Sequence, residues 1–135
     1  MKTENIANIA AAIIISSSAL FVTPTALAGD VVNASLACYV DTKAFDQLTA
    51  DYCASGWKPG ENNPTIAYFE VMGLPAGNYS YAWNSSCGTG GFCNKSIRKD
   101  TSGGVPINLS VTVRDNDSGA VKTVSATAEY IDVYN

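Results

Sequence analysis

The stretch that decides the fold is residues 103–134, GGVPINLSVTVRDNDSGAVKTVSATAEYIDVY. An aliphatic side chain occupies every odd position from Val105 to Val113, and the positions between them are mostly polar. A period of two places one face of a strand in a core and the other face in water. Residues 114–119, RDNDSG, are turn formers, because Asp, Asn and Gly tolerate left-handed backbone. A second β-rich run, Val121–Tyr134, follows, so the sequence predicts a β-hairpin.

Residues 1–28 have the pattern of a secretory signal peptide. An apolar segment covers Ile6–Val22, and residues 26–28, ALA, supply the small-x-small pattern that a signal peptidase requires. A membrane-spanning helix is the alternative, but Ser16-Ser17-Ser18 interrupts the apolar run and no basic stop-transfer cluster follows it. We therefore expect a secreted or periplasmic protein without a membrane span after signal cleavage, and a single domain at residues 29–135.

Four cysteines belong to the expected mature chain: Cys38, Cys53, Cys87 and Cys93. An even number of cysteines in a small exported domain predicts disulfides, and three pairings are formally possible. We favour Cys38–Cys53 and Cys87–Cys93, since each pair is close in sequence. A zinc site is the competing interpretation, but the chain has no His and no C-x2-C pair.

Further strands are predicted by the same alternation of apolar and polar residues. They cover Val31–Val40, Thr65–Met72, Asn78–Asn84 and, as a shorter strand, Asn94–Arg98. Together with the hairpin they make about six or seven strands, the number typical of an antiparallel sandwich. The sequence therefore predicts an all-β fold that disulfides stabilise.

Three segments interrupt this pattern. Within residues 41–53, the spacing of Phe45, Leu48 and Tyr52 suits a short helix, whereas a loop or a short edge strand fits nearly as well. Residues 54–64 are rich in Gly, Asn and Pro and predict an irregular loop. A phase change near residues 122–123 predicts a β-bulge in the last strand.

Residues 79–83, YSYAW, follow Gly77, and residues 104–115 precede Gly119 and an alternating strand of Thr, Ala and Val. This arrangement resembles PKD-type and related immunoglobulin-like domains over residues 64–133. Two features depart from that family: residues 84–88, NSSCG, replace Asp-x-Gly-Asp-Gly, and residues 105–107, VPI, stand where an aromatic residue is expected. The resemblance implies an immunoglobulin-like (PKD-like) sandwich of about seven strands and supplies no catalytic residues. Such modules are mostly spacers, adhesion elements or ligand-binding accessories.

No set of residues in the sequence suits catalysis, a cofactor or a metal. The chain has no His, which excludes the usual Ser-His-Asp and Cys-His nucleophiles. Asp115 and Asp117 flank the predicted turn, where Asp commonly bonds to nearby backbone. They fit a calcium loop poorly, because Ala126 stands where its final acid should be. The net charge of −4 argues against nucleic acid as a partner, so we expect a non-enzymatic protein without cofactor or metal.

Two loops are the candidate ligand contacts. Residues 87–93, CGTGGFC, would present Phe92 and Thr89 on a small ring if the cysteines pair, and preorganised loops lose less entropy on binding. The alternative is a structural staple with Phe92 folded back on the sandwich. Trp57, in the segment GWKPG of residues 56–60, could stack on a sugar or anchor a protein contact, or it could cover one end of the core.

These features predict a small exported module that binds a protein or glycan ligand through surface loops. The alternative is a secreted effector or protease inhibitor that inserts the Cys87–Cys93 loop into a target cleft. Tyr79, Tyr81 and Trp83 share one face of a predicted strand, and their alternation favours packing over an aromatic binding platform.

Overall fold

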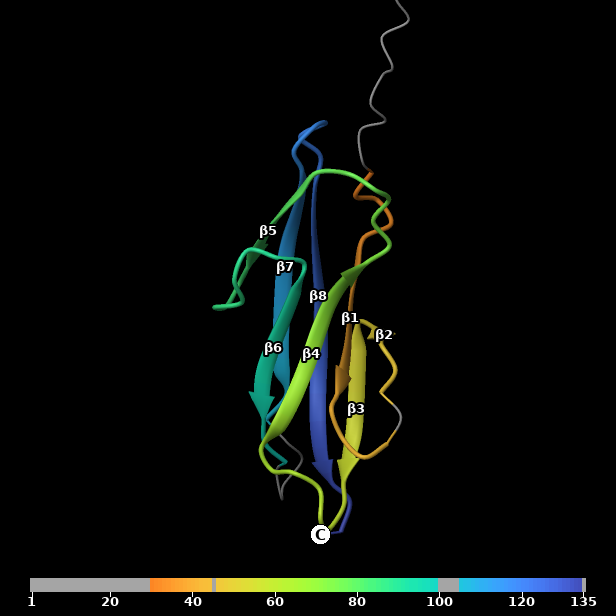
Figure 1. The fold of residues 1–135 in the computed structure, drawn as a ribbon, viewed down its shortest axis with the longest axis vertical. Coiled ribbons are helices and arrows are strands. Elements are labelled where there is room, and N and C mark those ends of the chain that lie inside the picture. The colour runs from red at the N-terminus through yellow and green to blue at the C-terminus, as the bar shows by residue number, and fades with distance from the viewer. Residues whose placement is uncertain (1–29, 45, 100–104, 135) are drawn as a thin grey trace, which may run out of the picture.

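The computed structural model describes residues 30–44, 46–99 and 105–134. Within these ranges the chain forms eight strands and no helix, arranged as two four-stranded sheets packed face to face (Figure 1). The fold class is all-β, as the sequence predicts. The predicted signal peptide, residues 1–28, lies outside the described residues.

The two sheets are named here by their place in Figure 1. The front sheet has the order β2-β1-β4-β6, with strands at Thr49–Ala50, Ser35–Val40, Thr65–Met72 and Phe92–Ile97. The back sheet has the order β3-β8-β7-β5, with strands at Tyr52–Trp57, Val121–Asp132, Ile107–Asp115 and Tyr79–Trp83.

The core lies between the sheets and is built from the apolar residues that alternate with polar ones along the strands and face inward. Leu109, Val111 and Val113 on β7 are almost fully buried, as the period of two in the sequence predicts. The other sheet contributes Phe69 from β4, together with the inward residues of β1. The predicted hairpin is β7–β8, whose register runs without a break from the Ile107–Ala128 pair to the Arg114–Val121 pair.

The prediction of a β-bulge near Lys122 is wrong, since Lys122 pairs with Val113 in the regular register. Lys122 occupies an inward-facing position near the start of β8. Its ammonium group donates hydrogen bonds to the carbonyl oxygens of Val32, at 2.6 Å, and Ala34, at 2.8 Å. The apolar alternation of β8 is therefore interrupted by a lysine, not by a bulge. Lys122 lies at the end of the core and binds the segment that precedes β1.

Strand β3 corrects two predictions. Residues 54–57 form a strand where the sequence predicts a loop, and β3 runs parallel to β8, so the sandwich is not wholly antiparallel. The ambiguous residues 41–53 contribute the short β2 and the start of β3, and the described part of this segment contains no helix. Gly56 favours a loop in the sequence, but in the structure it allows β3 to lie close to Val133. A Cβ atom at Gly56 would lie 2.9 Å from the Val133 side chain.

Both favoured disulfide pairings are confirmed. Cys38–Cys53 joins β1 in the front sheet to β3 in the back sheet, and both residues are buried. Cys87–Cys93 joins the loop that follows β5 of the back sheet to β6 of the front sheet. Two disulfides are consistent with an oxidising, exported environment.

The double variant Cys38→Ala/Cys53→Ala should lose about 2–5 kcal/mol of unfolding free energy, because it removes a buried cross-link between the sheets. Urea unfolding monitored by tryptophan fluorescence measures this loss. Cys87→Ala/Cys93→Ala is the matched control, and it should lose less because its bridge closes a span of 6 residues rather than 15. An equal or larger loss in the control would contradict a dominant role for the Cys38–Cys53 bridge.

Candidate ligand-binding face

The Cys87–Cys93 loop is fixed to the sandwich at several points. The indole N–H of Trp83 donates to the carbonyl oxygen of Gly90 at 2.9 Å. The N–H of Val71 donates to the carbonyl oxygen of Gly91 at 2.8 Å, and Cys93 is buried. The loop thus ties β5 of the back sheet to β4 and β6 of the front sheet, which makes it a structural staple.

The two predicted contact residues of this loop differ in their settings. Thr89 is exposed beside Gly88 at the tip of the loop. Phe92 begins β6 and is 63% exposed on the outer face of the front sheet, so it does not fold back on the core. The loop is therefore held to the sandwich, as the structural alternative predicts. Phe92 nevertheless presents its ring to solvent, as the contact alternative predicts.

Phe92 lines one end of a groove on the outer face of the front sheet, which the sequence does not predict. The register of the front sheet places Tyr39 of β1 directly opposite Tyr68 of β4, and their rings stack with centroids 4.7 Å apart and planes 18° apart. The groove holds about 310 Å³. We call it the aromatic groove and define it by the side chains of Tyr39, Leu48, Tyr68, Glu70, Phe92 and Asn94.

Carboxylate side chains lie near the aromatic groove. Burial is the main cause that raises the pKa of the Tyr39 phenol, followed by the neighbouring phenol of Tyr68 and the carboxylates of Asp46, Asp41 and Glu70. Glu70 lies directly opposite Phe92 in the register, and its side chain is exposed. The groove therefore combines aromatic rings with carboxylates, a combination that attracts a cation.

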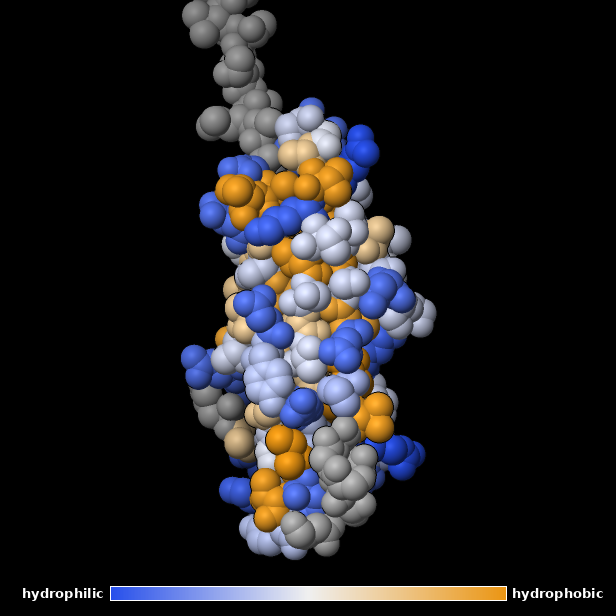
Figure 2. All heavy atoms as spheres, turned by 180° about the vertical axis from the view of Figure 1, so that it is seen from behind, coloured by the Kyte–Doolittle hydropathy of each residue, from blue (hydrophilic) through white to orange (hydrophobic). Residues whose placement is uncertain are grey.

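The outer face of the back sheet is built differently (Figure 2). Hydroxyl and amide side chains of β7 and β8 pair across the strands: Thr112 and Thr123 share a hydrogen bond of 2.8 Å, and the Thr127 hydroxyl donates to Asn108 at 2.6 Å. Polar side chains thus satisfy one another along part of this face, and Figure 2 shows apolar side chains between them. Its exposed tyrosine, Tyr52, donates to Glu129 at 2.9 Å.

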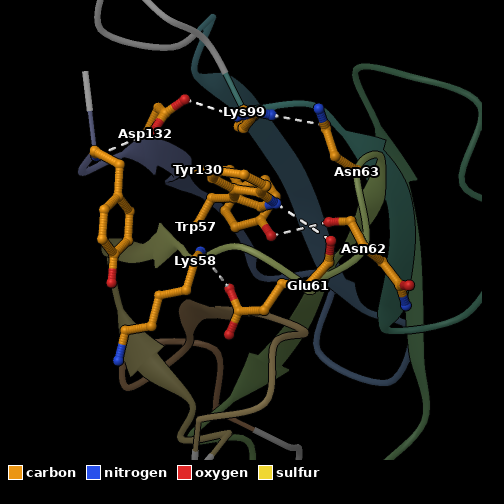
Figure 3. Close-up of polar contacts among 9 residues, drawn as sticks. Trp57, Lys58, Glu61, Asn62, Asn63, Lys99, Tyr130 and Asp132 are labelled. Atoms are coloured by element: carbon orange, nitrogen blue, oxygen red, sulfur yellow. Dashed lines mark hydrogen bonds and ion pairs between the residues drawn. The ribbon is translucent and has the colours of Figure 1, made fainter.

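Trp57 is the last residue of β3, an edge strand of the back sheet, and Figure 3 shows its polar surroundings. Phe92 is the first residue of β6, the edge strand on the other side of the sandwich in Figure 1, so the predicted contacts do not form one site. Its indole N–H donates to the carbonyl oxygen of Glu61 at 3.2 Å, and the ammonium of Lys99 lies 3.2 Å from its ring centroid. Lys99 also forms an ion pair of 2.7 Å with Asp132, whose side chain is 2% exposed. Trp57 therefore covers one end of the core, and Lys99 occupies one face of its ring.

Asp115 serves the turn between β7 and β8. Its carboxylate accepts hydrogen bonds from the N–H of Asp117 at 3.0 Å and from the N–H and hydroxyl of Ser118. The Ser118 hydroxyl is the main cause that lowers the pKa of this carboxyl group, and the two backbone bonds lower it further against the effect of burial. The predicted structural role of Asp115 is confirmed.

These bonds make stability depend on pH. A carboxyl group whose pKa is lowered by folding adds stability above its unfolded pKa of about 3.9, and this contribution is lost as the pH falls through the folded pKa. The unfolding free energies of the wild type and Asp115→Asn should therefore converge between about pH 5 and pH 2. Denaturant unfolding across this range measures the gap, with Asp117→Asn as the control. A gap independent of pH would contradict the role of the carboxylate.

Neither a metal site nor a membrane span is found in the parts of the chain that the structure describes. These residues contain no group of three or more His, Cys, Asp or Glu side chains that could hold a metal ion. Within the same ranges no helix has the length and apolar character to cross a bilayer. Comparisons with known proteins find no match among family models, curated proteins or solved structures.

Proposed function

We propose that this protein is an exported recognition module that acts by binding, without catalysis, and takes a protein ligand in the aromatic groove. The observation that carries the proposal is the groove itself, in which stacked tyrosines and an exposed phenylalanine lie beside Glu70. Exposed aromatic clusters on a small domain are typical of binding sites. The two disulfides support export.

A protein ligand suits the groove better than a glycan does. Tyr39 and Tyr68 are stacked on each other, so each ring uses one face on its partner and they do not form a flat coplanar platform. The carboxylates near Tyr39 favour a cationic side chain, and arginine both stacks on aromatic rings and pairs with carboxylates. We therefore propose a ligand that inserts an arginine or lysine.

The alternative, an inhibitor that inserts the Cys87–Cys93 loop into a cleft, has less support. The loop is tied to the sandwich by Trp83 and Val71, and its exposed tip is short. We favour the groove because its aromatic surface is larger and already formed.

The domain is further proposed to be immunoglobulin-like, as the sequence resemblance implies. Two features support this. The strands β1, β4 and β6 are neighbours in one sheet, in the order of immunoglobulin strands A, B and E. The strands β5, β7 and β8 are neighbours in the other sheet, in the order of strands C, F and G.

Selection from a random peptide display library tests the proposed function. Enriched peptides should carry arginine or lysine, and Phe92→Ala or Glu70→Gln should weaken their binding about tenfold, the effect of losing a central contact. Tyr52→Ala is the matched control, since it removes a half-exposed tyrosine from the other sheet and should leave binding unchanged. A glycan array run in parallel decides the ligand class. Glycan retention that Phe92→Ala abolishes, without any peptide enrichment, would contradict the protein ligand.

A further inference from the structure

The aromatic groove ends at an open edge of the front sheet. Strand β6 pairs with β4 on one side and is the last strand of that sheet on the other. Phe92 and Asn94 belong both to the groove and to this edge strand. A ligand in the groove therefore lies next to the backbone of β6.

The phase of hydrogen bonding decides which backbone groups of β6 face the edge. Val71 donates to the carbonyl oxygen of Gly91, which fixes Gly91 as a residue whose backbone groups point toward β4. In an antiparallel pair this direction alternates along the strand, so Cys93, Lys95 and Ile97 also point toward β4. The N–H and C=O groups of Phe92, Asn94 and Ser96 therefore point to the open edge, where no described residue bonds to them.

We propose that β6 accepts an extended segment of a partner protein as an added strand, which pairs with the backbone of Phe92, Asn94 and Ser96 and places an arginine or lysine in the aromatic groove. The inference rests on the proposed function and specifies its binding mode. An edge strand with a neighbouring side-chain pocket is the arrangement that strand addition requires, because main-chain bonds give affinity and the pocket gives specificity.

Charge and reach favour a cationic side chain on the added strand. The new strand would lie about 4.8 Å beyond β6, and Glu70 of β4 is about the same distance on the other side of β6. A long arginine or lysine side chain opposite Phe92 can cross its exposed ring toward Glu70. This geometry places the cation over an aromatic face and beside a carboxylate.

A second copy of this chain is a less suitable occupant. Lys95 lies in the middle of β6 on the inward-facing side, and its ammonium donates to the carbonyl oxygen of Ser86 at 2.9 Å. Pairing of two copies through β6 would bring two such strands together, and an inward-pointing charge on an edge strand is a known means of preventing edge-to-edge association. Each copy would also bring the same acidic groove and a net charge of −4.

The first experiment measures amide hydrogen exchange by NMR, with a probe peptide of six residues to match the length of β6. The probe alternates threonine and valine and carries arginine at one inner position. In the free protein the amides of Phe92, Asn94 and Ser96 should exchange fast, whereas those of Cys93, Lys95 and Ile97 should exchange slowly. Saturating probe should slow the first set and leave the second set slow. The same peptide with glutamate in place of arginine should bind about tenfold more weakly.

The second experiment uses variants of the edge. Ser96→Pro removes an edge-facing N–H without removing a bond to β4, and it should weaken probe binding about tenfold or more, whereas Ser96→Ala should bind as the wild type does. Slow exchange at Cys93 and Lys95 shows whether the proline variant is folded. If the proline variant is unfolded, the protection of the wild-type edge amides by the probe tests strand addition alone.

The outcomes separate the binding mode from the function. Binding that depends on Phe92 but leaves the amides of Asn94 and Ser96 unprotected would overturn strand addition and leave the groove as the ligand site. Absence of binding by any cationic peptide, selected or designed, would overturn both. Protection of the edge amides in the free protein that rises with protein concentration would identify a second copy as the occupant and overturn the proposed partner.

Discussion

The Cys38–Cys53 disulfide is the constraint on which the rest of the structure depends. It joins β1 of the front sheet to β3, an edge strand of the back sheet, where the chain passes from one sheet to the other, and both cysteines belong to the buried core. A domain of this size buries a thin core, so a covalent tie between its layers matters for stability. Tyr39 is the outward neighbour of Cys38 on β1, and the pairing of β1 with β4 places it opposite Tyr68. The aromatic groove therefore lies on the strand that the disulfide ties to the back sheet.

The second disulfide has a different consequence. The Cys87–Cys93 loop carries the chain from the edge of the back sheet to the edge of the front sheet, and its bonds to Trp83 and Val71 cover the gap between them. It also ends at Phe92, so the staple determines where β6 begins and where the exposed ring stands. The ring of mostly small residues thus contains one exposed aromatic side chain, Phe92, directly before its buried closing residue Cys93.

Much of the fold follows from the period of two in the sequence, and the failures have identifiable causes. Thr65–Met72 is a strand with the predicted bounds, and both cysteine pairs are as predicted. Strand β3 escapes prediction because it lacks an apolar alternation and contains Gly56, which favours a loop in the sequence but here allows close approach to Val133. Trp57 and Phe92 can be named as prominent aromatic residues, but only the structure shows that they belong to edge strands of different sheets.

The groove is missed for a related reason. Tyr39 and Tyr68 lie on the outward faces of predicted strands, where alternation assigns residues to solvent, and only the pairing of β1 with β4 brings them together. The available signal in the sequence is one outward aromatic residue on each of two predicted strands. It predicts a groove only when the pairing of the two strands is known. The strand order of the front sheet leaves β6 at the edge where we propose that a partner strand adds. Under this proposal, Lys95 on the inward side of β6 would disfavour pairing between two copies, while Phe92 and Glu70 would favour a partner with a cationic side chain. The proposed selectivity thus rests on one inward lysine and one outward carboxylate, and neither belongs to the buried core.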